Sequence, residues 1–209
     1  MYYNSTVALE FFRRAAGEAR TLGVLAAGFN PPTRAHLALA GASLGIVDEV
    51  LFVLPREFPH KSYENASFNQ RMEMLLASTG DEPRYSVASS DGGLFVEIAG
   101  ECREIYGDET TLVFICGRDA AERILNWDYG RPDAFEQMLE DFEMLVAPRS
   151  GDFQPPDKMQ RRIRPLPVGS GLSAISSTEV RERVHRGLPW EHMVPPEIIA
   201  MVRRIYGTR

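Results

Sequence analysis

The sequence predicts an α/β protein with a Rossmann-like, doubly wound parallel sheet and a small C-terminal helical part. Three observations lead to this prediction. Short apolar runs of strand length alternate with longer amphipathic segments, which is the pattern of successive βαβ units. The chain has 209 residues, a length that suits one large domain. Its 44% hydrophobic and 25% charged residues are typical of a globular protein with a sizeable core.

The first segment is expected to differ from the rest of the chain. Val7, Phe11, Phe12 and Ala15 recur at helical spacing, so we predict a helix over 6–20. An N-terminal helical extension then covers 1–21, and one domain covers 22–209. The strands expected in that domain are the apolar runs 22–26, 50–54, 84–88, 111–116, 144–147 and 163–168. The expected helices cover 34–44, 68–78, 94–106, 118–126, 132–140, 178–186 and 196–205.

Charge and composition disfavour several classes of protein. The formal net charge is −6, whereas nucleic-acid-binding proteins are usually basic, so no nucleic-acid partner is expected. Two cysteines, Cys102 and Cys116, are too few for a disulfide framework or a Cys-rich zinc site. No apolar run approaches the ~20 residues that span a bilayer, and the first residues lack the pattern of a signal peptide. We therefore expect a cytoplasmic protein without a membrane partner or a metal site of its own.

A site is expected in the loops that follow strands, because ligands of doubly wound sheets bind beyond the carboxyl ends of the strands. These loops are 27–36, 55–63, 117–128, 147–151 and 169–178.

The first of these loops contains Gly28, which lets a ligand approach the backbone closely. It leads to His36 in the first turn of a helix, where free amides favour anions. A simple Gly-Pro turn with Thr33 as a cap and His36 at the surface explains the residues equally well.

The last loop has three hydroxyl side chains, Ser176, Ser177 and Thr178, at the start of a helix, with Arg181 one turn later. Such a group suits an oligophosphate. The alternative is a capping box formed by Ser176 and Glu179, which is common.

Two further segments are weaker signals. After the strand 111–116, Gly117 permits close approach, Asp119 can accept a ribose hydroxyl, and Trp127 offers a stacking surface. Each of these residues alone is more typical of a turn, a cap or packing. Lys61, after the strand 50–54, is on its own more typical of a solvated loop.

Together these segments resemble those of the nucleotidylyltransferases, and within them the bacterial nicotinate mononucleotide adenylyltransferases, over roughly residues 22–207. GFNPPTRAH at 28–36 resembles the N-terminal signature of the family, and ISSTEVR at 175–181 resembles its C-terminal partner. Three other segments resemble features of the subfamily, namely 59–61, 114–127 and 194–206.

The resemblance implies adenylyl transfer from ATP, accompanied by Mg²⁺, to nicotinate mononucleotide, which gives deamido-NAD and pyrophosphate. Catalytic roles are implied for His36, Thr33 and Arg181. ATP binding is implied for Gly28, Phe29, Asn30, His36, Gly117, Asp119, Arg149, Ile175, Ser176, Ser177, Thr178 and Arg181. Binding of the acceptor mononucleotide is implied for Lys61, Gly92, Gly93 and Trp127.

The sequence departs from the family pattern at three places. Thr33 replaces the first signature histidine, Ala35 replaces a glycine, and the P-S-Y-T segment is absent at 90–95. These departures leave two alternatives open. One is transfer to another phosphate acceptor, such as nicotinamide mononucleotide or phosphopantetheine. The other is a nucleotide-binding regulator without activity. A homo-oligomer is compatible with the sequence.

Overall fold

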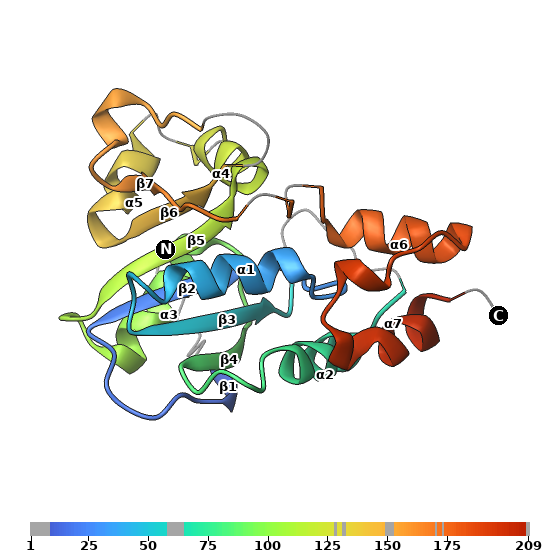
Figure 1. Cartoon of the computed structure of the whole chain (residues 1–209). Helices are drawn as coiled ribbons and strands as arrows, with labels where there is room; N and C mark the ends of the chain where they lie inside the picture. The colour runs from blue at the N-terminus through green and yellow to red at the C-terminus, as the bar shows by residue number, and fades with distance from the viewer. Residues whose placement is uncertain are drawn as a thin grey trace.

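The chain folds around a seven-stranded sheet with the order β1-β4-β3-β2-β5-β6-β7 and helices on both faces (Figure 1). The central strand β2 (Thr21–Ala26) pairs in parallel with β3 (Glu49–Pro55) on one side and with β5 (Thr111–Gly117) on the other. This is the doubly wound arrangement predicted from the sequence. The computed structural model describes residues 9–57, 65–127, 129–130, 133–148, 153–169, 171–172 and 174–207.

The outer parallel strands extend the sheet in both directions. Strand β4 (Tyr85–Ser90) lies beyond β3, while β6 (Glu143–Ala147) and β7 (Ile163–Pro165) lie beyond β5. Every residue of β3 and β4 is buried, as expected for parallel strands that are covered on both faces.

The predicted N-terminal helix is wrong for the described residues. Residues Glu10–Arg13 form strand β1, which pairs antiparallel with β4. The adjacent aromatic residues Phe11 and Phe12 favour a strand, and pairing satisfies the backbone groups of β4 at the edge of the sheet. Arg13 fixes this strand by donating hydrogen bonds to the carbonyl oxygens of Thr79 at 2.7 Å and Tyr85 at 3.3 Å. Residues 1–8 lie outside the described part.

The remaining predicted elements are confirmed with small changes at their ends. Helices α1 (Arg34–Ser43) and α2 (Phe68–Ser78) cover one face of the sheet. Helices α3 (Phe95–Tyr106), α4 (Arg118–Leu125) and α5 (Ala134–Asp141) cover the other. A short 3-10 turn at Asp157–Met159 precedes β7.

The C-terminal helices form a third core, which confirms the predicted small helical part. It contains α6 (Ser177–Arg186) and α7 (Ile199–Tyr206), with 3-10 turns at Glu191–Met193 and Pro196–Ile198 between them. Both helices lie beyond the end of the sheet toward which β3 points (Figure 1). Of the helices in the described residues, none has the length and apolar character needed to span a bilayer.

Candidate functional site

The parallel strands end at one edge of the sheet, and the loops that leave this edge contain most of the predicted site residues. The direction of winding changes between β2 and β5, since β3 and β4 lie on one side and β6 and β7 on the other. A doubly wound sheet binds its ligand at this point, outside the carboxyl ends of the strands. The loop after β2 and the start of α4 after β5 are therefore neighbours at the expected position.

The loop after β2 holds the ring of His36 in one orientation. The backbone N–H of Thr33 donates to His36 Nδ1 at 3.0 Å, and Thr33 Oγ1 lies 2.8 Å from the same nitrogen. Thr33 is fully buried, and the ring of Phe29 packs edge-on against the imidazole. Because Nδ1 accepts a hydrogen bond from the Thr33 amide, the neutral imidazole carries its proton on Nε2.

Helix α6 brings the second signature to this loop. Arg181 Nη1 donates to the Asn30 carbonyl oxygen at 2.6 Å, and Ser177 Oγ donates to the Pro31 carbonyl oxygen at 2.8 Å. Arg181 Nη2 also donates to Thr178 Oγ1 at 3.3 Å. Segments about 150 residues apart in the chain are thus joined by direct hydrogen bonds, as the resemblance implied.

Two residues of the second signature have structural contacts. Ser176 Oγ accepts a hydrogen bond from the Glu179 backbone N–H at 3.1 Å and caps α6. The Glu179 carboxylate pairs with Arg183 at 2.6 Å. The alternative interpretation of Ser176 as a cap is therefore correct for its side chain. Ile175 is buried in the C-terminal core, so only its backbone is suited to contact a nucleotide.

Two residues that the sequence analysis did not assign to the site support the same loop. Arg71 of α2 is only 2% exposed, and its Nη1 donates to the Gly28 carbonyl oxygen at 3.0 Å. Tyr206 of α7 donates from its hydroxyl to Asn30 Oδ1 at 2.6 Å. Burial raises the pKa of Tyr206, while the nearby positive charges of Arg181 and Arg71 act in the opposite direction. The loop is therefore surrounded by two guanidinium groups and a neutral phenol.

Arg71 and Tyr206 could both have been identified from the sequence as buried, hydrogen-bonded side chains. Arg71 shares the buried face of α2 with Leu75 and Ser78, and an arginine on such a face indicates a buried, hydrogen-bonded cation. Tyr206 ends an amphipathic helix, and a buried tyrosine hydroxyl usually has a hydrogen-bond partner.

Helix α4, which begins directly after β5, separates the two predicted binding residues Asp119 and Trp127. Gly117 is the N-cap of α4, and Asp119 lies exposed in its first turn. Trp127, which is 41% exposed, follows the other end of α4. Eight residues of helix correspond to about 12 Å of rise, so Asp119 and Trp127 do not lie side by side.

The loop after β4 contains the predicted glycines and is fixed by side chains of α3. Gly92 and Gly93 are partly buried. The Gly92 carbonyl oxygen lies 2.9 Å from Ser90 Oγ, and the Leu94 N–H donates to Glu97 Oε2 at 3.0 Å. The amide of Leu94 is thus already used, which leaves Gly92 and Gly93 as the candidates for ligand contact. Lys61 and Arg149 lie outside the described residues.

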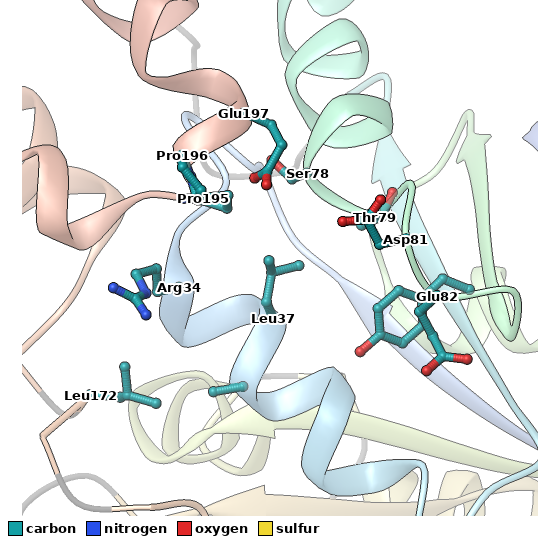
Figure 2. Close-up of a pocket in the computed structure, with 12 residues that line it drawn as sticks. Arg34, Leu37, Ser78, Thr79, Asp81, Glu82, Leu172, Pro195, Pro196 and Glu197 are labelled. Atoms are coloured by element: carbon teal, nitrogen blue, oxygen red, sulfur yellow. The ribbon is translucent and has the colours of Figure 1, made fainter.

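A cavity of about 520 Å³ lies between α1, the end of α2 and the turn at Pro195 to Glu197, and Leu172 of the loop 169–178 also lines it (Figure 2). None of the predicted site residues is among its twelve lining residues. Arg34 and Leu37 of α1 line it, together with the carboxyl side chains Asp81, Glu82 and Glu197. This acidic lining does not suit a triphosphate, and the cavity is distinct from the candidate site.

Comparisons with known proteins agree with the geometry. The cytidylyltransferase-like family matches residues 25–183. A probable nicotinate-nucleotide adenylyltransferase of Tropheryma whipplei is 32% identical, with 86% of this chain and 98% of the relative covered. One of Thermoanaerobacter sp. is 29% identical, with 88% and 92% covered.

The fold is also similar to a solved structure, nicotinic acid mononucleotide adenylyltransferase of Plasmodium falciparum complexed with NaAD. The TM-score is 0.66 at 18% identity, with 88% of this chain and 95% of that chain covered. The fold, the two joined signatures and the relatives lead to one conclusion. The chain belongs to the cytidylyltransferase-like family, and it is a nucleotidyltransferase that resembles the nicotinate-nucleotide adenylyltransferases.

Proposed function

We propose that the protein transfers the adenylyl group of ATP to nicotinate mononucleotide, forming deamido-NAD and pyrophosphate, in the cytoplasm. The observation that carries the proposal is the contact between the two signatures. Hydrogen bonds from Arg181 and Ser177 join α6 to the loop that holds His36. The identity of the acceptor, nicotinate mononucleotide, is inferred from the names of the relatives.

The chemistry is a displacement at the α-phosphorus. The 5′-phosphate of the mononucleotide attacks this atom in line, and the bond to the oxygen that bridges to the β-phosphate breaks, releasing pyrophosphate. No nucleophile from the protein is needed, so catalysis consists of positioning the reactants and stabilising charge. His36 donates from Nε2 to an α-phosphate oxygen as negative charge develops, because its Nδ1 is already held by the Thr33 amide.

The start of α6 holds the outer phosphates. Ser177 and Thr178 lie in the first turn of the helix, where backbone amides point outward. Arg181 spans the space between this turn and Asn30, where its guanidinium is able to bind two phosphate oxygens. Among the described residues there is no group of three or more His, Cys, Asp or Glu side chains suited to a metal. We therefore treat Mg²⁺ as part of the MgATP substrate, bound by phosphate oxygens and water.

The acceptor half is proposed to lie over the ends of β4 and β5. Strands β3 and β2 lie between β4 and β5, so the ends of β4 and β5 are three strand spacings, roughly 14 Å, apart, and the acceptor is proposed to lie across the ends of the two strands between them. Gly92 and Gly93 offer amides for the pyridine carboxylate, and Trp127 offers a ring surface. Gly117 and Asp119 belong to the ATP half, where they accommodate a ribose. Lys61 and Arg149 remain proposed phosphate and adenine contacts.

A pyrophosphate-release assay with a panel of acceptors tests the proposal. MgATP is held constant, and the acceptors are nicotinate mononucleotide, nicotinamide mononucleotide, phosphopantetheine and buffer alone. We expect release with nicotinate mononucleotide. Activity only with phosphopantetheine would assign another acceptor. Absence of release with every acceptor, despite ATP binding, would favour a regulator.

A further inference from the structure

The carboxyl group of Glu101 lies beneath the loop that connects β4 to α3. Glu101 belongs to α3 and is only 5% exposed. Its Oε1 lies 2.7 Å from Ser90 Oγ, at the carboxyl end of β4. Its other oxygen, Oε2, has no hydrogen-bond partner among the residues that the structure describes. An ionised carboxylate in such a position is costly, so these surroundings favour the neutral acid.

The hydrogen bonds of Ser90 also indicate that Glu101 is in its neutral, protonated form. Ser90 Oγ lies 2.9 Å from the Gly92 carbonyl oxygen and 2.7 Å from Glu101 Oε1. A carbonyl oxygen only accepts, and a serine hydroxyl has one proton to donate. If Ser90 donates to Gly92, the second contact is a hydrogen bond only when Glu101 donates to Ser90. Both contacts are satisfied together when Glu101 is protonated.

Burial, assisted by the charges around it, places the pKa of Glu101 near neutral pH. Burial raises its pKa to about 7; the hydrogen bond with Ser90 acts against this rise, and the negative charges of Asp91, Glu97 and Glu104 act with it. The neighbouring Cys102 thiol stays neutral, because burial raises its pKa to about 12.

The positive charge of Arg56, near the end of β4, is already paired with carboxylates. Arg56, which follows β3, lies with Nε 3.4 Å from Asp91 Oδ1 and also pairs with Glu10 of β1. Arg56 donates its backbone N–H to the Ser90 carbonyl oxygen at 2.8 Å, so β3 and β4 end side by side at this point. The part of the site proposed to bind the acceptor, at the carboxyl end of β4, is consequently rich in carboxyl groups. The part proposed to bind ATP is not.

We propose that Glu101 is a positioning residue for an anionic acceptor. In its neutral form it donates to Ser90, and through Ser90 it holds the Gly92 carbonyl and the loop of residues 91–94. Deprotonation removes that donor and adds a negative charge below the loop, which weakens binding of an acceptor that bears a carboxylate. This inference rests on the proposed function for its consequence in catalysis, but the hydrogen-bond arrangement can be tested without any substrate.

The first test is a pH titration of the free protein by amide proton–nitrogen correlation spectra between about pH 5.5 and 8.5. We expect the Gly92 and Gly93 amide signals to shift in the wild-type protein with a midpoint near the pKa of Glu101. The shift should be absent in Glu101→Gln, where a neutral amide replaces the acid, and strongly reduced in Ser90→Ala, which interrupts the link. The matched control is Glu109→Gln, an exposed acid just beyond the end of the same helix, which should keep the wild-type titration.

The second test measures KM for nicotinate mononucleotide over the same pH range. We expect the wild-type KM to rise roughly three- to tenfold above neutral pH, while KM for ATP changes little. Glu101→Gln should keep the low value throughout. Amide signals of Gly92 and Gly93 that do not titrate in the wild-type protein would overturn the proposal, and so would a Glu101→Gln variant with the wild-type KM profile. Absence of turnover with every acceptor would instead contradict the proposed function, and the amide titration would still decide the role of Glu101.

Discussion

Two loops at the carboxyl ends of the strands, 28–33 in the ATP half of the site and 90–94 in the acceptor half, are held by different kinds of contact. The loop at 28–33 receives hydrogen bonds from the guanidinium groups of Arg71 and Arg181 and from the phenol of Tyr206. The loop at 90–94 is held by two acids of α3, Glu97 directly and Glu101 through Ser90. The comparison teaches that pH should change the hydrogen bonds that hold the loop at 90–94 while leaving those that Arg71, Arg181 and Tyr206 make to the loop at 28–33 almost unchanged.

The largest expected effect comes from the ATP half. His36→Ala should lower kcat by a factor on the order of 10²–10³, because it removes a donor that acts on charge in the transition state. KM for ATP should change much less. Steady-state pyrophosphate release measures both constants. Near-normal turnover in this variant would show that His36 is not the donor.

Arg181→Lys should weaken ATP binding by about tenfold, although it keeps the charge. A guanidinium can hold the Asn30 carbonyl and phosphate oxygens at once, whereas an ammonium group cannot reproduce this planar fork. The loss should be smaller for AMP, which lacks the outer phosphates. Titration calorimetry with both nucleotides distinguishes the outcomes, and equal losses would place Arg181 away from those phosphates.

The acceptor half should discriminate between acid and amide by roughly tenfold. Backbone amides facing the pyridine carboxylate leave a polar contact unpaired when a carboxamide replaces it, at a cost of ~1–3 kcal/mol. The lower end is expected here, since the Tyr and Thr side chains of the family segment are absent. The ratio of kcat/KM for nicotinate and nicotinamide mononucleotide at saturating ATP is the measurement. A ratio near one would mean dual specificity.

The smallest expected effect on catalysis is that of Tyr206→Phe. Loss of the hydroxyl leaves buried Asn30 Oδ1 without its donor, which should cost ~1–3 kcal/mol of stability. KM for ATP should rise only a few-fold. Tyr129→Phe is the matched control, because its hydroxyl donates to the Ile124 carbonyl oxygen on the opposite face of the sheet. Urea denaturation and ATP kinetics should separate the two variants, and equal ATP kinetics would show that the Asn30 contact is only structural.

Much of the fold could be predicted because the chain alternates apolar and amphipathic runs with clear ends. Helix α2 is an example, since its predicted and observed bounds agree and Ser67 caps its start. Residues 10–13 could not be assigned correctly from periodicity alone. Phe11 and Phe12 fit both a helical face and a short strand, and the pairing with β4, more than 70 residues away, decides between them.

The candidate site also contains residues that could be predicted from the sequence and residues that could not. Motif residues whose side chains are proposed to contact ATP, such as His36 and Arg181, are recognisable from order and spacing. Arg71 and Glu101 are distinguished by burial and by hydrogen-bond partners distant in sequence or across a loop. Helix α4 separates Trp127 from Asp119, which is compatible with their proposed contacts to different parts of the substrates.

Strand β1 has a consequence for the solubility of shortened forms of the protein. An outer strand presents unpaired backbone groups that can recruit another chain and start aggregation. At one side of the sheet this risk is limited by the length of β7, three residues that end at Pro165. At the other side, β4 has six residues and is shielded by β1. A protein shortened to residues 20–209 would lose that shield while keeping β2 and the C-terminal helices, so we expect it to self-associate even if its nucleotide loops remained intact.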